Sequence, residues 1–232
     1  PVEVINLEND EMEAFFVSEK IVNLQNMGIK LSKMAILTRA SFQFKDLEDR
    51  FIRENIKYKV VGGLRFYERA EIKDALAFFR LLIKSDDNLS FERIINIPKR
   101  GLGSVFLRKL NDFAKKNNLS LLDSLRKYLE TETLSKGPRD NITMFLKVLD
   151  KHKEMLKNKD HFEVAGALLD DIGYTDMLKN EKTIESEGRL ENLKKLVVDI
   201  RSRSTLNEFL EEVSLLTDVS NESEGTEKIS IM

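Results

Sequence analysis

The stretch YKVVGGLRFYERAEIKDAL, residues 58–76, decides how the chain is organised. Its first residues are mostly aromatic or β-branched and are closed by Gly62 and Gly63, which predicts a strand that ends in a sharp turn. From about Glu68 to Ile83 the apolar residues recur at helical spacing, which predicts a helix. The chain therefore changes from strand to helix here, and the residues on either side differ in character.

The residues before this stretch predict alternating strands and helices. Apolar, β-branched runs at 2–7 and 34–38 are typical of strands, and amphipathic segments that begin near Asp10 and Ser41 are typical of helices. Together with the strand at 58–61, the order is strand, helix, strand, helix, strand. That order predicts parallel βαβ units in an α/β fold.

The residues after this stretch predict helices almost throughout. The expected helices cover residues 89–96, 104–116, 120–129, 140–157, 161–172, 183–202 and 206–216, with breaks at Pro98, Gly101–Gly103, Gly137–Pro138 and Gly173. Residues 229–232 again alternate as a strand does, and we expect them to return to the first sheet. The predicted fold class is α/β plus all-α. Residues 1–84 would form a partial parallel sheet, 85–225 a large helical insertion and 226–232 the returning strand.

Composition excludes several classes of protein. The chain has 232 residues, no cysteine and two histidines, so disulfides, thiolate metal sites and multi-histidine sites are not expected. The missing cysteines agree with a reducing, cytoplasmic setting. No apolar run approaches the roughly 20 residues of a membrane span, so no membrane partner is expected. Because the chain starts at Pro1 rather than Met, we expect it to be a piece of a longer protein.

The net charge of −2 hides an uneven distribution. Residues 89–127 hold nine Lys or Arg against three Asp or Glu, whereas residues 205–232 hold one Lys against seven acids. A local excess of cations suggests that this region faces an anionic partner, although a solvated helix surface has the same composition.

Catalytic motifs are absent from the sequence. No G-x-x-x-x-G-K-S/T loop occurs, and no Asp-Glu pair follows an apolar strand, so ATP hydrolysis by this chain alone is not expected. No G-x-S-x-G elbow occurs either. His152 lies between two lysines on an expected exposed helix face, and His161 lies at an expected helix start. We therefore predict no catalytic residue here.

The segment IPKRGLGS, residues 97–104, is the best candidate binding site. Gly101 and Gly103 permit positive φ angles and let a ligand approach the backbone. Ser104 is expected to cap the next helix, whose positive end would face outward and suit a phosphate. Lys99 and Arg100 add positive charge without base specificity. Helix, glycine hairpin and helix together predict a contact with the DNA backbone that includes Leu102.

Phe66 and Tyr67 follow the double glycine and could stack on bases, but aromatic residues at a strand–helix corner are more often part of a core. Glu68, Glu71 and Asp74 lie near the expected helix start, where acids interact favourably with the helix dipole.

The sequence resembles the UvrD/PcrA/Rep family of superfamily-one DNA helicases. The resemblance runs in order through the whole chain, over MAILTR at 34–39, VVGGLRFYERAEIKD at 60–74, DDNLSFERIIN at 86–96, PKRGLG at 98–103, SEGRLENL at 186–193 and ISIM at 229–232. It implies that residues 1–84 and 226–232 are part of the second RecA-like motor subdomain. It also implies that the helical block is the insertion carried by that subdomain.

The resemblance also implies a function. The hairpin at Gly101–Gly103 would contact duplex DNA, and Arg65 and Arg39 would face single-stranded DNA. The parent would be a bacterial, cytoplasmic, ATP-dependent 3′-to-5′ helicase of DNA repair. Its partners would include the remaining motor subdomains and repair proteins. ATP and Mg²⁺ would be held by residues outside this chain, which would be inactive alone.

Two alternatives remain open at this stage. The chain could be a protein-interaction module in which the acidic C-terminal helix and the helical block dock a regulator. It could also be a piece of an AddAB/RecB-type helicase–nuclease.

Overall fold

The computed structural model describes residues 2–131, 134–221 and 227–232. Contacts divide the chain into two units, each described by itself. The sheet unit comprises residues 1–69 and 215–232, and the helical unit comprises residues 70–214. The boundary differs from the expected one at residue 84. Helix α3 (Ala70–Ile83) belongs to the helical unit, because its buried side chains pack against helices of that unit.

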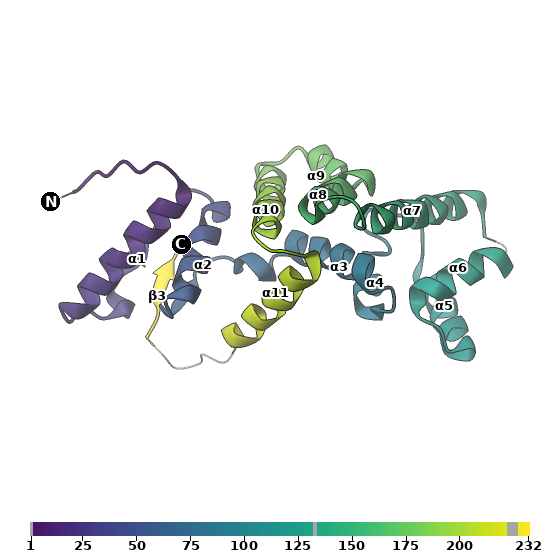
Figure 1. Ribbon diagram of the computed structural model, residues 1–232, viewed down its shortest axis with the longest axis horizontal. Helices are drawn as coiled ribbons and strands as arrows, with labels where there is room; N and C mark the ends of the chain where they lie inside the picture. The colour runs from purple at the N-terminus through teal and green to yellow at the C-terminus, as the bar shows by residue number, and fades with distance from the viewer. Residues whose placement is uncertain (1, 132–133, 222–226) are drawn as a thin grey trace. The chain divides into compact units, whose positions relative to one another are not determined.

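A small parallel sheet organises the sheet unit. Strand β3 (Ile229–Ile231), the yellow arrow in Figure 1, lies between β1 (Ala35–Ile36) and β2 (Tyr58–Val60) and runs parallel to both. Ser230 is in register with Ala35 on one side and Lys59 on the other. The central strand of this sheet is thus supplied by residues far along the chain from its neighbours.

Two helices build the core of the sheet unit with the strands. Helices α1 (Asp10–Asn26) and α2 (Phe44–Arg53) pack against each other, and Phe44, Leu47 and Phe51 of α2 are buried. Short 3-10 turns, η1 (Leu31–Lys33), η2 (Ser41–Gln43) and η3 (Phe66–Glu68), lead into or out of the strands. The core residues are Ala14, Ile21, Leu31, Phe44, Leu47, Phe51, Ile56, Ile229 and Ile231.

The expected strand at residues 2–7 is wrong. This segment forms no strand, and Val2 and Val4 are 95% and 92% exposed. A strand needs a partner for its backbone N–H and C=O groups, and none of the described residues pairs with this segment. Asn9, rather than Asp10, caps α1 by accepting from the Met12 N–H at 2.9 Å.

The helical unit consists of helices joined by short turns. After α3 come α4 (Asn88–Ile94), α5 (Ser104–Asn117), α6 (Leu121–Thr131), α7 (Lys136–Met155), α8 (His161–Asp171), α9 (Tyr174–Glu181), α10 (Ile184–Arg201) and α11 (Leu206–Asn221), the last of which ends in the sheet unit. Helix α9 was not expected. Gly137 and Pro138, expected as a break, lie in the first turn of α7, where proline is tolerated because no intrahelical N–H bond is lost.

Polar contacts inside the helical unit tie α3 to its neighbours. Asp74 accepts hydrogen bonds from Tyr174 Oη at 2.9 Å and Arg93 Nε at 2.7 Å. Asn192 Nδ2 donates to Glu71 Oε1 at 2.7 Å. The two acids near the start of α3 therefore fix it to α4, α9 and α10, which is a structural role.

His152 is not on an exposed face, contrary to expectation. Its side chain is fully buried, Nδ1 lies 2.9 Å from the Val148 carbonyl and Nε2 lies 3.4 Å from Asp171. The flanking lysines are exposed, because residues one position away point to other sides of a helix. His161 does begin α8, and its Nε2 donates to the Ile200 carbonyl at 3.0 Å.

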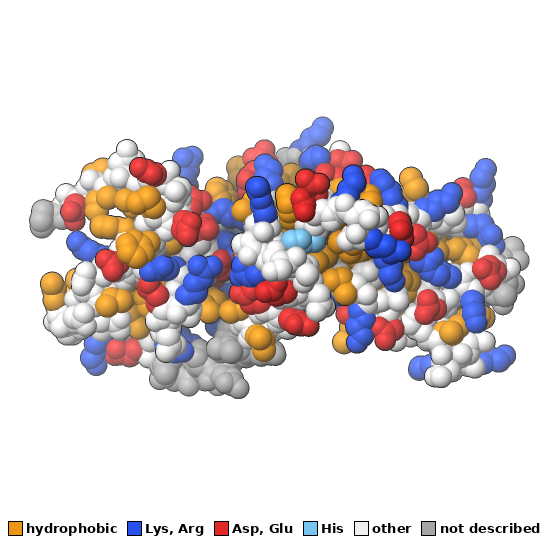
Figure 2. Space-filling model, in the orientation of Figure 1, with side chains coloured by type: hydrophobic (Ala, Val, Ile, Leu, Met, Phe, Trp, Pro, Cys, Tyr) orange, Lys and Arg blue, Asp and Glu red, His pale blue; other side chains and the backbone are white. Residues whose placement is uncertain are grey.

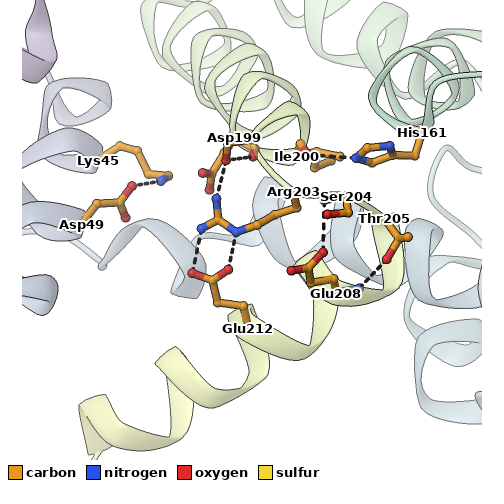
Figure 3. A network of polar contacts seen from close by, with 11 residues as sticks. Lys45, Asp49, His161, Asp199, Ile200, Arg203, Ser204, Thr205, Glu208 and Glu212 are labelled. Atoms are coloured by element: carbon orange, nitrogen blue, oxygen red, sulfur yellow. Dashed lines mark hydrogen bonds and ion pairs between the residues drawn. The ribbon is translucent and has the colours of Figure 1, made fainter.

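Figure 3 shows how the turn between α10 and α11 is fixed. The Arg203 guanidinium binds both carboxylate oxygens of Glu212, with Nη2 2.7 Å from Oε1. The Ser204 N–H donates to the Glu208 side chain at 3.1 Å, and the Glu208 N–H donates to Thr205 Oγ1 at 3.1 Å. Two of the acidic side chains of α11, Glu208 and Glu212, are thus bound to groups of the helical unit.

Candidate nucleic-acid interface

The hairpin, residues 97–103, connects α4 to α5 in the helical unit. Helix α4 ends at Ile94, and the peptide bond between Ile97 and Pro98 is cis. Gly101 has a φ of +76°, a conformation that side chains with a Cβ disfavour. The chain therefore reverses direction in a short turn whose shape depends on Gly101.

Arg100 supports the hairpin from within and does not present its charge. Its side chain is buried, and Nη1 lies 2.8 to 3.0 Å from the carbonyl oxygens of Ile94, Ile95 and Ile97. The guanidinium carbon lies 4.4 Å from the centroid of the Phe145 ring. Burial lowers the pKa of Arg100 to about 10, so it stays charged at neutral pH. A guanidinium held in this way is not available to a phosphate, which corrects its expected role.

Two asparagines complete the support of the hairpin. The Asn96 side chain accepts from the Leu102 N–H at 3.2 Å and donates to the Leu102 carbonyl. From α7, Asn141 Nδ2 donates to the Arg100 carbonyl at 3.3 Å. The Leu102 side chain is buried and anchors the turn rather than contacting a ligand. Asn96 was missed as a site residue, although a polar residue inside the run IINI could have indicated it.

The outer side of the hairpin is open. Lys99, Gly101, Gly103 and Ser104 are exposed, and a Cβ added at Gly103 would meet nothing within 4 Å. Gly103, not Ser104, is the N-cap of α5, and no side chain caps this helix end. The start of α5 is thus exposed and uncapped by any side chain, and the exposed Lys99 precedes it by four residues in the chain. Free N–H groups and the positive dipole end at a helix start suit an anion.

Cationic residues continue along α5 from the hairpin. The exposed residues of this helix include Arg108, Lys109, Lys115 and Lys116. Figure 2 shows Lys and Arg side chains spread over the part of the helical unit that holds α5 and α6, with acidic side chains between them. The cations of α5 are therefore exposed but interspersed with acidic side chains.

The sheet unit holds the other two predicted DNA-facing residues, each of which follows a strand. Arg39 follows β1 and Arg65 follows β2, and the carboxyl ends of parallel strands lie at the same edge. Arg39 is exposed. Arg65 is half-buried, with its guanidinium carbon 5.8 Å from the centroid of the Tyr58 ring. This edge also carries the exposed turn at Gly62 and Gly63.

Glu48, which sequence reasoning missed, holds the chain that carries Arg65. Its buried carboxylate accepts from the Phe66 N–H at 2.9 Å through Oε2. Desolvation raises the pKa of Glu48 to about 7, against the opposing effects of that hydrogen bond and of Arg69. The other oxygen, Oε1, has no hydrogen-bond partner among the residues described. No sequence signal marks this Glu, because charged residues are frequent on α2.

Phe66 and Tyr67 are buried in the sheet unit, with ring centroids 5.1 Å apart in an edge-to-face arrangement. They belong to the core and cannot stack on a base without leaving it.

No helix in the described part of the chain is long and apolar enough to cross a membrane. Nor do the described His, Cys, Asp and Glu residues form a group able to hold a metal ion.

The chain thus combines a small parallel sheet with a long helical segment, which lies between the second and third strands in sequence and carries the glycine hairpin. This combination can be compared with known families. The model of the UvrD-like helicase C-terminal domain matches residues 1–232, so the chain belongs to this family.

Curated relatives agree with this assignment. A probable DNA helicase II homologue of Rickettsia felis is 35% identical over 218 residues, which are 94% of this chain and 33% of that protein. DNA helicase II of Rickettsia typhi is 35% identical over the same shares. The ATP-dependent DNA helicase PcrA of Staphylococcus epidermidis is 35% identical over 97% of this chain and 31% of its own length. The chain thus spans about a third of the length of these relatives.

Proposed function

We propose that this chain is the DNA-gripping part of an ATP-dependent 3′-to-5′ DNA helicase that acts in DNA repair. In this role the hairpin contacts the phosphates of duplex DNA ahead of the point of strand separation. The residues that make the contact are the exposed ones, Lys99, Gly101, Gly103 and Ser104. Arg100 and Leu102 hold the turn in shape. Family membership and the names of the relatives support the proposal.

One observation carries the proposal. The hairpin combines a Cβ-free exposed backbone at Gly103, the uncapped start of α5 and the exposed cation Lys99 in one short segment of chain. Phosphate oxygens are bound in proteins by such combinations of backbone N–H groups, a helix dipole and a cation. Because none of these groups reads a base edge, the contact would have little sequence preference and strong salt dependence.

The sheet unit has a separate role in the proposal. It would be part of the second RecA-like motor subdomain, with Arg39 and Arg65 at the carboxyl edge of the sheet facing single-stranded DNA. Residues that bind ATP and Mg²⁺ would be supplied by the rest of the parent protein, and the helical unit would be the insertion of this motor subdomain. The sequence of residues 1–232 contains no glycine-rich phosphate loop, which agrees with this division of roles.

Gly103→Val tests the hairpin most cleanly. Its φ is −77° and its Cβ position is open, so the substitution should leave the fold unchanged while placing a side chain where a phosphate would approach. We expect affinity for a duplex with a 3′ single-stranded tail, measured by fluorescence anisotropy at low salt, to fall about tenfold. Gly101→Val is a weaker test, because its positive φ would strain the turn itself.

Gly188→Val is the matched control, because Gly188 on α10 also has open space at its Cβ position. It should leave duplex affinity unchanged. If Gly103→Val and Gly188→Val bind the duplex equally well, the hairpin is not the contact and the proposed function loses its main support.

A further inference from the structure

A groove on the helical unit has no residue of the hairpin in its lining. It has a volume of about 570 Å³ and is formed by α8, α9 and α10, which pack against one another (Figure 1). Its lining is mostly apolar and includes Leu169, Leu190, Leu193, Val197 and Val198. This volume is in the range of sites that bury a ligand or the anchor side chains of a partner.

The groove is an open surface of the bundle. Val198 is 68% exposed, and Leu190 and Val197 are only half-buried. Helix α10 also buries Leu196 and Ile200, on another side of the helix, inside the unit. A surface helix normally has one apolar stripe that faces the core. The second stripe of α10 is therefore available to something outside the unit.

The length of the groove suits a helix. Its lining on α10 extends from Glu187 to Val198, which corresponds to about 16 Å along the helix axis at 1.5 Å per residue. That length matches about three turns of a second helix laid along α10. Helices that dock in grooves do so through apolar residues spaced at i, i+3, i+4 and i+7.

The charges at the groove determine the kind of helix. Lys179 and Lys194 are already paired, at 3.1 Å with Asp176 and at 2.5 Å with Glu191. Two other carboxylates of the lining, those of Asp170 and Glu187, have no cationic partner among the residues described. The unbalanced charge of the groove is therefore negative.

The two carboxylates lie along the groove rather than across it. Helices α8 and α10 are antiparallel, since His161 bonds the Ile200 carbonyl and a Cβ at Gly166 would lie 3.6 Å from Val197. Asp170, one turn beyond Gly166, is then level with Leu193 or Lys194. Glu187 lies about 10 Å further along α10, which equals roughly two turns of a docked helix.

We propose that this groove docks a basic amphipathic helix of a partner protein. Leu, Ile, Met or Phe side chains of the partner would fill the apolar floor. Two Lys or Arg residues about seven positions apart would pair with Asp170 and Glu187. This interface is separate from the DNA contact and does not depend on it.

The test uses the 232-residue chain and a displayed library of helical peptides about 16 residues long, in which apolar positions are fixed at helical spacing and the others vary. We expect the enriched peptides to carry Lys or Arg about two turns apart and to bind a labelled sample of the chain. Val198→Glu should weaken the binding of an enriched peptide about tenfold, because it places a charge in the apolar floor. Glu187→Lys should weaken it about threefold.

Met144→Glu is the matched control, because Met144 on α7 is 63% exposed and does not line the groove. It should leave peptide binding unchanged. Thermal unfolding of each variant checks the fold, and Glu187→Lys carries the test if Val198→Glu unfolds.

The proposal is overturned if enriched peptides bind Val198→Glu as tightly as the original chain, or if acidic peptides are enriched as often as basic ones. It is also overturned if no peptide is enriched while the apolar dye anilinonaphthalene sulfonate binds and is lost in Val198→Glu, since the groove would then take a small ligand. Duplex affinity of Val198→Glu should not change, so failure here and failure of the proposed function are distinguishable.

Discussion

The hairpin of the helical unit and the turn after β2 in the sheet unit are both held in place by a buried charged side chain, but the two side chains have opposite charges. Each is a glycine-containing turn that carries an expected DNA-facing cation, Lys99 in one and Arg65 in the other. Each is fixed by a buried charged side chain, since Arg100 binds carbonyl oxygens and Glu48 binds the Phe66 N–H. In both, one polar atom of the buried group, Arg100 Nη2 or Glu48 Oε1, has no hydrogen-bond partner among the described residues.

The two turns differ in how burial affects the protonation of the charged group. Arg100 keeps its charge at neutral pH, because burial lowers its pKa only to about 10. Three carbonyl oxygens accept hydrogen bonds from its guanidinium. Glu48 has one backbone N–H for its carboxylate, and desolvation outweighs this bond, so its pKa rises into the neutral range. The hairpin should therefore be insensitive to pH near neutrality, whereas the turn after β2 should not be.

Removing the buried cation should have the largest effect. Arg100→Met leaves several carbonyl groups without their donor, and we expect the helical unit to lose about 3 to 4 kcal/mol of unfolding free energy. Urea denaturation followed by circular dichroism measures this. Lys99→Ala, one residue earlier and exposed, should change the stability by less than about 0.5 kcal/mol. Equal stability of the two variants would show that the buried guanidinium does not support the hairpin.

The second-largest effect should be the change in stability of the sheet unit with pH. The pKa of Glu48 is about 7 in the folded state, against an ordinary value of 4.5, so the folded state binds the proton more tightly. Its stabilising contribution is present below about pH 4.5 and is lost as the pH rises through about 7, by up to about 3 kcal/mol. Lys45, Asp49 and Arg69 also face this carboxylate and affect its pKa.

Glu48→Gln should abolish this dependence, because the amide keeps an acceptor for the Phe66 N–H and cannot ionise. Melting curves between pH 5 and 8, recorded for both proteins with a probe in the sheet unit, check it. If the difference between them is the same at every pH, the carboxylate does not titrate in this range and the comparison of the two turns fails.

The smallest expected effect is on DNA affinity, and it distinguishes the two turns by the kind of DNA that each contacts. Lys99→Ala should weaken duplex binding a few-fold, by about 1 kcal/mol, and reduce the salt slope by about 1, with little change for single strands. Arg65→Ala should do the reverse and weaken single-strand binding a few-fold. Anisotropy titrations with both ligands at several salt concentrations measure this. Loss of both activities in each variant would mean that the two turns contact one DNA segment.

Much of the fold could be predicted from the sequence, because periodicity and capping residues are local signals. The starts of α5 and α8 agree with the prediction, and Thr183 caps α10 through its side chain. Helix α9 was missed because it has only eight residues and follows Gly173, which adopts a φ of +79° and separates it from α8 by a single tight turn.

The candidate site was harder to predict, because burial is not a local property. In PKRG the sequence shows two adjacent cations, and only packing against Phe145 and the end of α4 distinguishes the buried Arg100 from the exposed Lys99. His152 was misplaced for the same reason. Residues 2–7 have the composition of a strand, but a strand forms only where a partner edge is available.

The position of β3 has a consequence for biosynthesis. Because this strand separates β1 from β2, the sheet can close only after residues 229–231 have left the ribosome, whereas all of residues 70–214 emerge earlier. Contacts of such large sequence separation are slow to form, while helices with local contacts form quickly. The helical unit should thus fold first on the nascent chain. Until β3 emerges, α1 and α2 have only an incomplete sheet to pack against, and their apolar side chains remain accessible to chaperones.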